Sequence, residues 1–485
     1  MKKFFLTLSV VLIAAAAVAD STTVLLNQNF EGCSEGAALG QAGMVVSPAT
    51  QWGEVAADGA TIETVDGNKV LKVTQIEGAG QQGIAIPFDG SGIVLGPGNY
   101  LTVSFKRFQV AGHRYGEFRL NANYESTNTG DDGRRPVINF ENNGTQLNFL
   151  KNGYDLSPDS QSGKDVSYPG VVTEDTWQEF QFDIDLATGL VDFYIDGVQQ
   201  SSATYQLVIK RCDGFAYLVF ANGTGGADTT RPGVYYDDIK VEYLEVSKKL
   251  VRTINFGDYD EGQLLVDIAP AWMTALGTAE NCYITNLSFN SEQTSCLFLD
   301  QTPDTGFCID DIEAEKYEGC TYVFEIGTAA HYFDGQWRCD IRNGGMTFWR
   351  FWDNWHWKTS FNIDGTANKE IQFGNDGPID KWCRSSFVFN QDSTLYRTGR
   401  IDTGNMGSAY RAIGGYDFAN SPDHTFGYTD NISGSVDKVA FYHGWWASGS
   451  GPRFVSYANV YVLGVPEPGF LALGLIALVA FLRRR

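Results

Sequence analysis

The chain has 485 residues, which is long enough for two or three ordinary domains. Hydrophobic residues make up 43% of it and charged residues 19%, so packed cores are expected and extensive disorder is not. The formal net charge of −23 argues against a nucleic-acid partner, because phosphates would be repelled. Aromatic residues reach 14% beside 54 glycines, which favours strands joined by tight turns and predicts an all-β protein.

Residues 1–19 have the layout of a secretory signal peptide. Lys2 and Lys3 precede an apolar run, and a small-x-small triplet ends at Ala19. This pattern predicts removal by signal peptidase and a mature start at Asp20. An N-terminal membrane anchor is the alternative interpretation.

A polar strand face is predicted early in the chain. It alternates with Phe118 and Leu120, which are expected to point into a core. Sugars need planar hydrogen-bonding groups for their hydroxyls and an aromatic ring for their apolar face. An ordinary solvated face is the alternative. The candidate sugar-binding residues are Tyr115, Glu117, Arg119, Asn121 and Asn123.

A β-hairpin follows. Phe180, Phe182 and Ile184 alternate with polar residues, and a second alternating strand leads to a tight turn at Asp196-Gly197. The run from Trp177 to this turn resembles the hairpin signature of laminin-G and concanavalin-like jelly rolls. That resemblance implies an antiparallel β-sandwich.

Both ends of the same region resemble jelly-roll carbohydrate-binding modules, through residues 29–32 and 236–239. Such modules often hold a structural Ca²⁺ between their first and last strands. The resemblance implies Glu31 and Asp238 as ligands, since Ca²⁺ takes about six to eight oxygen atoms. The alternative is an unpaired surface Glu and a strand-end Asp.

A charged break at residues 245–249 separates two stretches that begin alike. Asn29-Phe30 reappears as Asn255-Phe256, and a Glu-Gly step follows each pair. We therefore predict two tandem antiparallel β-sandwich (jelly-roll) domains, over residues 20–246 and 250–464.

Eight cysteines in an exported chain predict disulfides. Cys33 and Cys212 would close the first domain, and the pairing of the other six stays open. Buried free thiols are the alternative.

The densest aromatic cluster lies at residues 348–357. Asp353-Asn354 is predicted to be the turn between two strands, the first of which carries aromatic residues on both faces. Both faces cannot belong to the core of a two-layer sandwich unless a loop or a partner covers one. Stacking on a glycan is one interpretation and core packing is the other. The candidate ring residues are Trp349, Trp352, Trp355, Trp357, Trp445 and Trp446.

The C-terminal segment 465–485 combines three parts in a fixed order. These parts are Pro466, Glu467 and Pro468, an apolar run over 469–482, and Arg483, Arg484 and Arg485. The apolar run predicts a short transmembrane helix with its arginines on the cytoplasmic side. The layout resembles the PEP-CTERM sorting signal of Gram-negative bacteria. It implies export across the inner membrane, cleavage by an exosortase-type protease, and a final place at the cell surface or in the extracellular matrix. A plain C-terminal anchor is the alternative.

Catalytic signatures are missing from the sequence. It has no H-E-x-x-H, phosphate loop or nucleophile elbow, and no Glu-x-Asp-x-x-Glu strand of the family 16 glycoside hydrolases, which share the concanavalin-like fold. The acidic cluster at 310–313 is interpreted as a solvated turn. We predict an exported carbohydrate-binding protein without catalysis or organic cofactor, whose partner is a polysaccharide. A glycan hydrolase or lyase on the same fold, and a structural matrix protein with no specific ligand, are the alternatives.

Overall fold

The computed structural model is built almost entirely of β-strands. It describes residues 20–46, 55–76, 81–114, 116–121, 136–149, 166–200, 207–208, 215–222, 231–289, 292–300, 302–317, 319–330, 337–343, 346–354, 358–363, 368–372, 382–390, 396–403, 411–417, 436–443 and 453–465. Within these ranges, no helix has the length and apolar character that crossing a membrane requires. The predicted signal peptide and nearly all of the predicted sorting signal, including its predicted transmembrane helix, lie outside these ranges.

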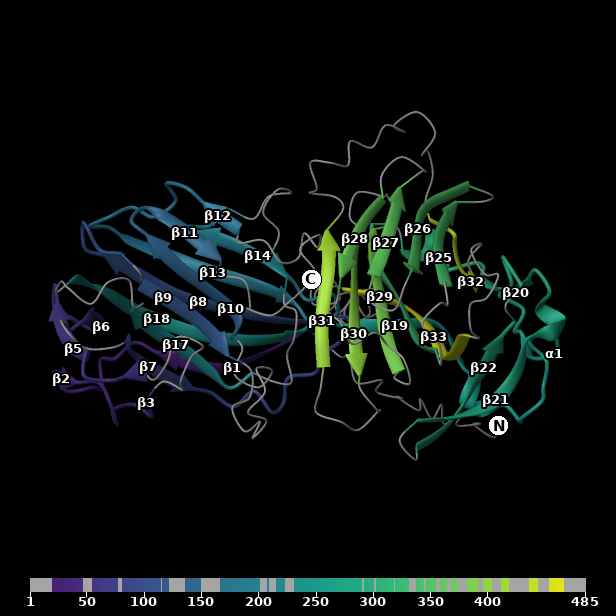
Figure 1. Cartoon of the computed structure of the whole chain (residues 1–485), viewed down its shortest axis with the longest axis horizontal. Coiled ribbons are helices and arrows are strands. Elements are labelled where there is room, and N and C mark those ends of the chain that lie inside the picture. Colours follow the sequence, from purple (N-terminus) through teal and green to yellow (C-terminus); the bar gives the residue numbers. More distant parts are fainter. Residues whose placement is uncertain are drawn as a thin grey trace, which may run out of the picture.

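Two sheets, A and B, form the first half of the described chain (Figure 1). Sheet A contains β1 (Ser21–Gln28), β2 (Gly36–Ala37), β5 (Ala60–Val65), β6 (Asn68–Gln75), β8 (Asn99–Gln109), β13 (Trp177–Asp185), β14 (Leu190–Ile195), β15 (Val198–Gln199), β16 (Leu207–Val208) and β18 (Arg231–Glu245). Sheet B contains β3 (Val45–Val46), β4 (Val55–Ala56), β7 (Gln81–Pro87), β9 (Gly116–Asn121), β10 (Pro136–Asn143), β11 (Gln146–Phe149), β12 (Val166–Tyr168) and β17 (Tyr217–Asn222). The strand pairs are antiparallel except for β4 with β7.

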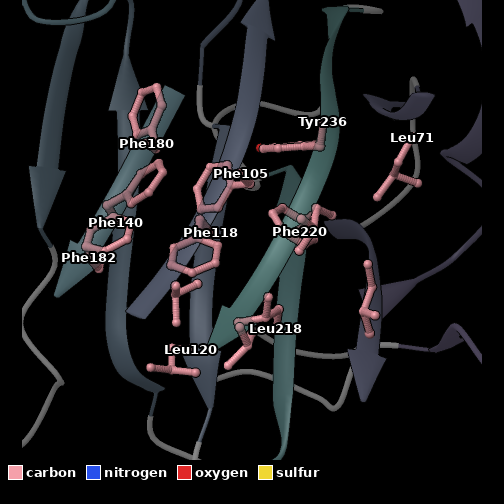
Figure 2. Packing of buried hydrophobic residues seen from close by; sticks show 14 of the residues in the cluster. Leu71, Phe105, Phe118, Leu120, Phe140, Phe180, Phe182, Leu218, Phe220 and Tyr236 are labelled. Carbon is pink, nitrogen blue, oxygen red and sulfur yellow. The ribbon is translucent and has the colours of Figure 1, made fainter. Parts of the chain in front are cut away.

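A Phe-rich core joins sheets A and B. Phe105 on β8 and Phe118 on β9 have ring centroids 4.7 Å apart, and both side chains are buried. Figure 2 shows these rings among Phe140, Phe180 and Phe182, which come from both sheets. Full burial of one such side chain contributes about 1.5–3 kcal/mol, so this layer accounts for the packing of the two sheets face to face.

Sheets C and D form the second half. Sheet C contains β19 (Lys248–Asn255), β21 (Tyr283–Phe289), β22 (Glu292–Leu299), β24 (Thr321–Ala330), β29 (Trp382–Asn390), β30 (Tyr396–Thr403), β31 (Arg411–Asp417) and β33 (Arg453–Leu463). Sheet D contains β20 (Met273–Leu276), β23 (Gly306–Ile309), β25 (Trp337–Asn343), β26 (Met346–Asn354), β27 (Lys358–Ile363), β28 (Asn368–Gln372) and β32 (Lys438–His443). Short helical turns are α1 (Leu265–Ile268), η2 (Phe256–Asp258), η3 (Ala279–Asn281) and η4 (Ala314–Tyr317). One core cluster contains residues of both sheets.

The two halves repeat one strand order. Sheet B runs β11-β10-β9-β17-β7, and sheet D runs β27-β26-β25-β32-β23, with the strands in the same relative chain order. The first strand of each half pairs with its last, β1 with β18 and β19 with β33. The repeated phenylalanines Phe30 and Phe256 are both fully buried. The strand order therefore supports two copies of one plan, while the exact domain limits stay a prediction.

The predicted hairpin is confirmed. Phe180 lies opposite Ile195, and Phe182 lies opposite Phe193, across β13 and β14. Asp196 and Gly197 both have positive φ, at 51° and 73°, as a two-residue turn of this hand requires.

Side-chain contacts connect the two halves. Lys248 on β19 of the second half donates a hydrogen bond from Nζ to the Pro97 carbonyl of the first half, at 3.3 Å. Arg384 on β29 donates from Nη2 to the Leu95 carbonyl at 2.6 Å. The same guanidinium lies 3.6 Å from Glu325, measured from Nε to Oε2. Arg384 therefore links a buried carboxylate of the second half to a loop of the first.

The disulfide prediction is not supported. Cys33, Cys282, Cys296 and Cys320 carry free thiols in the described part of the chain. On sheet D, Cys308 lies opposite Ala440 and Cys339 lies opposite Phe441 of the same strand, β32. Because consecutive residues of a strand point to opposite faces, the two cysteines lie on opposite faces of the sheet. The predicted partner of Cys33, at position 212, lies outside the described residues.

Candidate functional site

The outer face of sheet B carries the centre of the predicted sugar-binding strand. On β9, Phe118 and Leu120 are buried in the core as predicted, so Glu117 and Arg119 belong to the opposite face. The pattern of the strand is thus confirmed. The environment differs from an ordinary solvated face, because Glu117 is only 1% exposed and Arg119 only 3% exposed.

Glu117 is held by two donors. Its Oε2 accepts a hydrogen bond from Gln81 Nε2 at 2.7 Å, and the same oxygen forms an ion pair with Nη2 of Arg119. Gln81 is at the start of β7, 36 residues earlier in the sequence. Sequence reasoning missed Gln81, because no local pattern marks a partner that comes from another strand.

Burial changes the acidity of this carboxyl group. Loss of solvent raises the pKa of Glu117, while the charge of Arg119 and the hydrogen bonds from Arg119 and Gln81 act in the opposite direction. A buried ionisable pair with a perturbed pKa is a feature that clusters at functional sites. Purely structural ion pairs also have perturbed pKa values.

Small apolar residues flank the pair on one side. Ala221 lies opposite Glu117 and Val219 lies opposite Arg119, and both are buried beside Ala85. Tyr217, at the start of the same strand β17, is partly buried against this cluster. Tyr217 is a second residue of this face that sequence reasoning missed.

Polar residues flank the pair on the other side. By register, Glu141 of β10 lies opposite Glu117. Further out, Asn148 Oδ1 accepts hydrogen bonds from Gln146 Nε2 at 2.6 Å and from Ser167 Oγ at 2.9 Å. These three side chains are partly exposed. The face therefore changes from a tightly closed apolar side to an accessible row of amides and hydroxyl groups.

The other residues predicted for this site are placed only in part. Asn121 ends β9, opposite Tyr217 and Pro136. Tyr115 and Asn123 lie outside the described residues.

The two predicted calcium ligands lie near a break in strand pairing. β18 pairs with β6 up to Tyr236, and it pairs with β1 from Ile239 onward. Asp238 lies between these two paired stretches of β18 and has a φ of 47°. Asp238 Oδ2 is 2.7 Å from Lys106 Nζ. Glu31 Oε1 accepts a hydrogen bond from the backbone amide of Lys69 at 3.0 Å.

Negative charge accumulates at this break. Burial, together with the neighbouring charges of Asp238 and Glu31, raises the pKa of Asp237 to about 6. Within the described residues, no group of three or more His, Cys, Asp or Glu side chains has a metal-binding arrangement. The carboxylates present suit a hard cation, but Asp238 would have to exchange its Lys106 partner for one. Calcium at this position stays a prediction.

The aromatic hairpin differs from its prediction at the turn. Asp353 and Asn354 belong to β26, where they pair with Thr359 and Lys358, so they do not form the turn. A register shift beside Phe348 breaks the strict alternation predicted for this strand. β26 ends at Asn354, which lies opposite Lys358, the first residue of β27.

Only two of the predicted tryptophans can be placed. Trp349 lies opposite Ile341, and Trp352 lies opposite Arg338, which puts these two positions on opposite faces of sheet D. The face of Trp349 is shared with the buried Cys339, two positions before Ile341 on β25. Trp355, Trp357, Trp445 and Trp446 lie outside the described residues.

Comparison with known proteins gives only distant similarity. No protein-family model matches the chain, and no curated protein matches it. A sialidase is 9% identical with a TM-score of 0.32, over 45% of this chain and 18% of that protein. The tandem CBM22-1–CBM22-2 domain of Paenibacillus barcinonensis Xyn10C is 10% identical with a TM-score of 0.25, over 92% of this chain and 100% of that one. The CBM2 module of the evolved Dit protein of Lactobacillus casei BL23 phage J-1 is 10% identical with a TM-score of 0.28, over 46% and 99%.

Proposed function

We propose that this chain is an exported protein of jelly-roll type that binds polysaccharide without catalysis, at the cell surface or in the extracellular matrix. The outer face of sheet B carries the proposal. There, the buried Glu117–Arg119 pair adjoins an accessible row formed by Gln146, Asn148 and Ser167.

This arrangement suits a sugar ring. The amides of Gln146 and Asn148 offer both donors and acceptors, which hydroxyl groups require in pairs. Tyr217 offers an aromatic ring at the other side of the buried pair for the apolar face of a sugar. The ion pair, held rigid by Gln81, would fix the spacing of the strands beneath the ligand.

A glycan array probed with residues 20–465 tests the proposal. We expect Tyr217→Ala and Asn148→Ala each to weaken binding by about tenfold, which corresponds to about 1.4 kcal/mol. Tyr194→Ala, a partly buried tyrosine on β14 of sheet A, serves as the matched control and should leave affinity unchanged. Absence of binding to every glycan would favour the structural-protein alternative.

Export and sorting form a second part of the proposal. The N-terminal segment 1–19 would be removed by signal peptidase, and the segment 465–485 would be cut by an exosortase-type protease near Pro466-Glu467-Pro468. Intact-mass analysis of protein from the native host tests this part. A surface-extracted species that retains Arg483, Arg484 and Arg485 would contradict it.

A glycan hydrolase or lyase is the second candidate, and one observation favours it. Glu117 and Glu141 occupy directly opposed positions on neighbouring strands, and burial raises the pKa of Glu117. A raised pKa suits a general acid that works beside an ionised carboxylate. Release of reducing ends or of unsaturated products from a glycan library, abolished by Glu117→Gln, would establish catalysis.

A further inference from the structure

Sheet D repeats the strand order of sheet B, so the site on sheet B has a counterpart. β25 corresponds to β9. In sheet B, β9 lies between β17 and β10, and in sheet D, β25 lies between β32 and β26. On β9, Glu117 lies opposite Ala221 and Arg119 lies opposite Val219. These partners belong to a small buried cluster on the outer face of sheet B.

Sheet D has an equivalent buried cluster on its outer face. Ala440 and Tyr442 of β32 are buried beside Cys308, and β25 places Asp340 opposite Ala440 and Arg338 opposite Tyr442. Arg338 and Asp340 therefore stand where Glu117 and Arg119 stand in the first half. The order of the charges along the strand is reversed between the two copies.

Basic residues dominate this face of sheet D. Arg350 of β26 lies opposite Asp340, and Arg342 of β25 lies opposite Lys438 of β32. Alternation along β27 places Lys358 on the same face as Ser360, which pairs with Trp352. The basic positions of the face are Arg338, Arg342, Arg350, Lys358 and Lys438, and its acidic positions are Asp340 and Glu370.

One edge of the face is described with its side chains. Lys438 Nζ is 3.2 Å from Asp310 Oδ1, and the lysine side chain is 36% exposed. Asp310 also accepts a hydrogen bond from Thr274. The carboxylate of Asp310 at this edge is therefore already neutralised by Lys438. On β25 and β26 this face has three arginine positions (338, 342 and 350) and one carboxylate position, Asp340.

We infer that the outer face of sheet D binds an anionic polysaccharide whose charges are carboxylates. The inference rests on the proposed function and adds its ligand class. Arginine pairs with carboxylates through two parallel hydrogen bonds, which gives both strength and orientation. Because the whole chain carries a net charge of −23, it would on average repel a polyanion, so binding requires a local cluster of basic positions such as this one. Trp352, on the same face by register, adds a ring position for stacking.

The test compares one polymer in two charge states. Residues 20–465 are titrated with polyglucuronate and with the same polymer after reduction of its carboxyl groups. We expect the acidic form to bind at least about tenfold more tightly (about 1.4 kcal/mol) at low salt. The difference should shrink as NaCl rises from roughly 0.01 M to roughly 0.15 M, because the Debye length falls from about 30 Å to about 8 Å.

Variants locate the site. Arg338→Gln/Arg350→Gln should reduce affinity for polyglucuronate by about tenfold or more and leave affinity for the reduced polymer unchanged. The control Lys240→Gln/Lys316→Gln makes the same charge change outside the strands of sheet D, at side chains that are 39% and 66% exposed, and should change affinity by less than about twofold. If the arginine variant does not fold, the comparison of the two polymers with the unaltered chain decides alone.

Three results would overturn the inference. Equal affinity for both polymers would leave the proposed function standing and remove the anionic ligand class. Equally tight binding of poly-L-glutamate would show that the face accepts any polyanion. Failure to bind the acidic polymer, the reduced polymer and every glycan on the array would remove the proposed function as well.

Discussion

The Glu117–Arg119 pair gives the sharpest prediction about stability. The two side chains are 1% and 3% exposed, so neither charge can be rescued by water when its partner is removed. Breaking a buried ion pair from one side costs about 3–5 kcal/mol, because the remaining charge is left uncompensated. We therefore expect Glu117→Leu and Arg119→Met each to lower the free energy of unfolding by about this amount. The double variant should lie close to the unaltered protein, because replacing both charges removes the desolvation cost together with the attraction.

Urea denaturation of the four proteins measures this cycle. Its surface counterpart is Lys72 with Glu63, whose nitrogen and oxygen are 3.0 Å apart and whose side chains are 23% and 39% exposed. The same cycle on that pair should give about 0–1 kcal/mol. Two results would refute this expectation. Each single variant could lose less than about 1 kcal/mol of unfolding free energy, or the double variant could lose the sum of the two single losses; either would mean that water reaches the pair.

The pH dependence of the same site has a definite sign. Because burial raises the pKa of Glu117, the folded state binds the carboxyl proton of Glu117 more tightly than the unfolded state does. The free energy of unfolding should therefore fall as pH rises from the unfolded pKa, about 4.3, through the folded one. Glu117→Leu/Arg119→Met should remove this part of the pH dependence.

The remaining predictions concern charge elsewhere. Because the pKa of Asp237 is raised to about 6, Asp237→Asn should raise the free energy of unfolding at pH 7 by about 1 kcal/mol, after allowance for the exposure of this side chain. At pH 4 the substitution should have little effect, and equal effects at pH 7 and pH 4 would contradict this prediction. Calcium should raise the melting temperature of a protein spanning residues 20–465 and chelation should lower it. An unchanged melting curve would remove Glu31 from any metal site. Arg384→Met should cost about 1–3 kcal/mol, since it removes the ion-pair partner of the buried Glu325. It should also speed proteolysis between the halves by removing the hydrogen bond to the Leu95 carbonyl, and a silent substitution would show that Glu325 is hydrated.

Local patterns in the sequence determined the strands and their faces. The alternation of Phe180 and Phe182 with polar residues predicted a hairpin. Asp196-Gly197 predicted the tight turn that follows its second strand, because backbone sterics depend on residues close in the chain. The same reasoning placed Phe118 in the core and Glu117 on the opposite face.

Tertiary structure decided what surrounds those faces. Gln81 meets Glu117 across strands that are distant in sequence, and Asp353 lies within a strand instead of a turn, because register is set by pairing between segments. Burial of Arg119 on the outer face, and the matching of Arg338 to Glu117 between the two halves, likewise follow from sheet order. The sequence by itself determined which residues can share a face, and the packing of the sheets decided which of them meet, because cross-strand contacts depend on non-local register and local backbone preference does not.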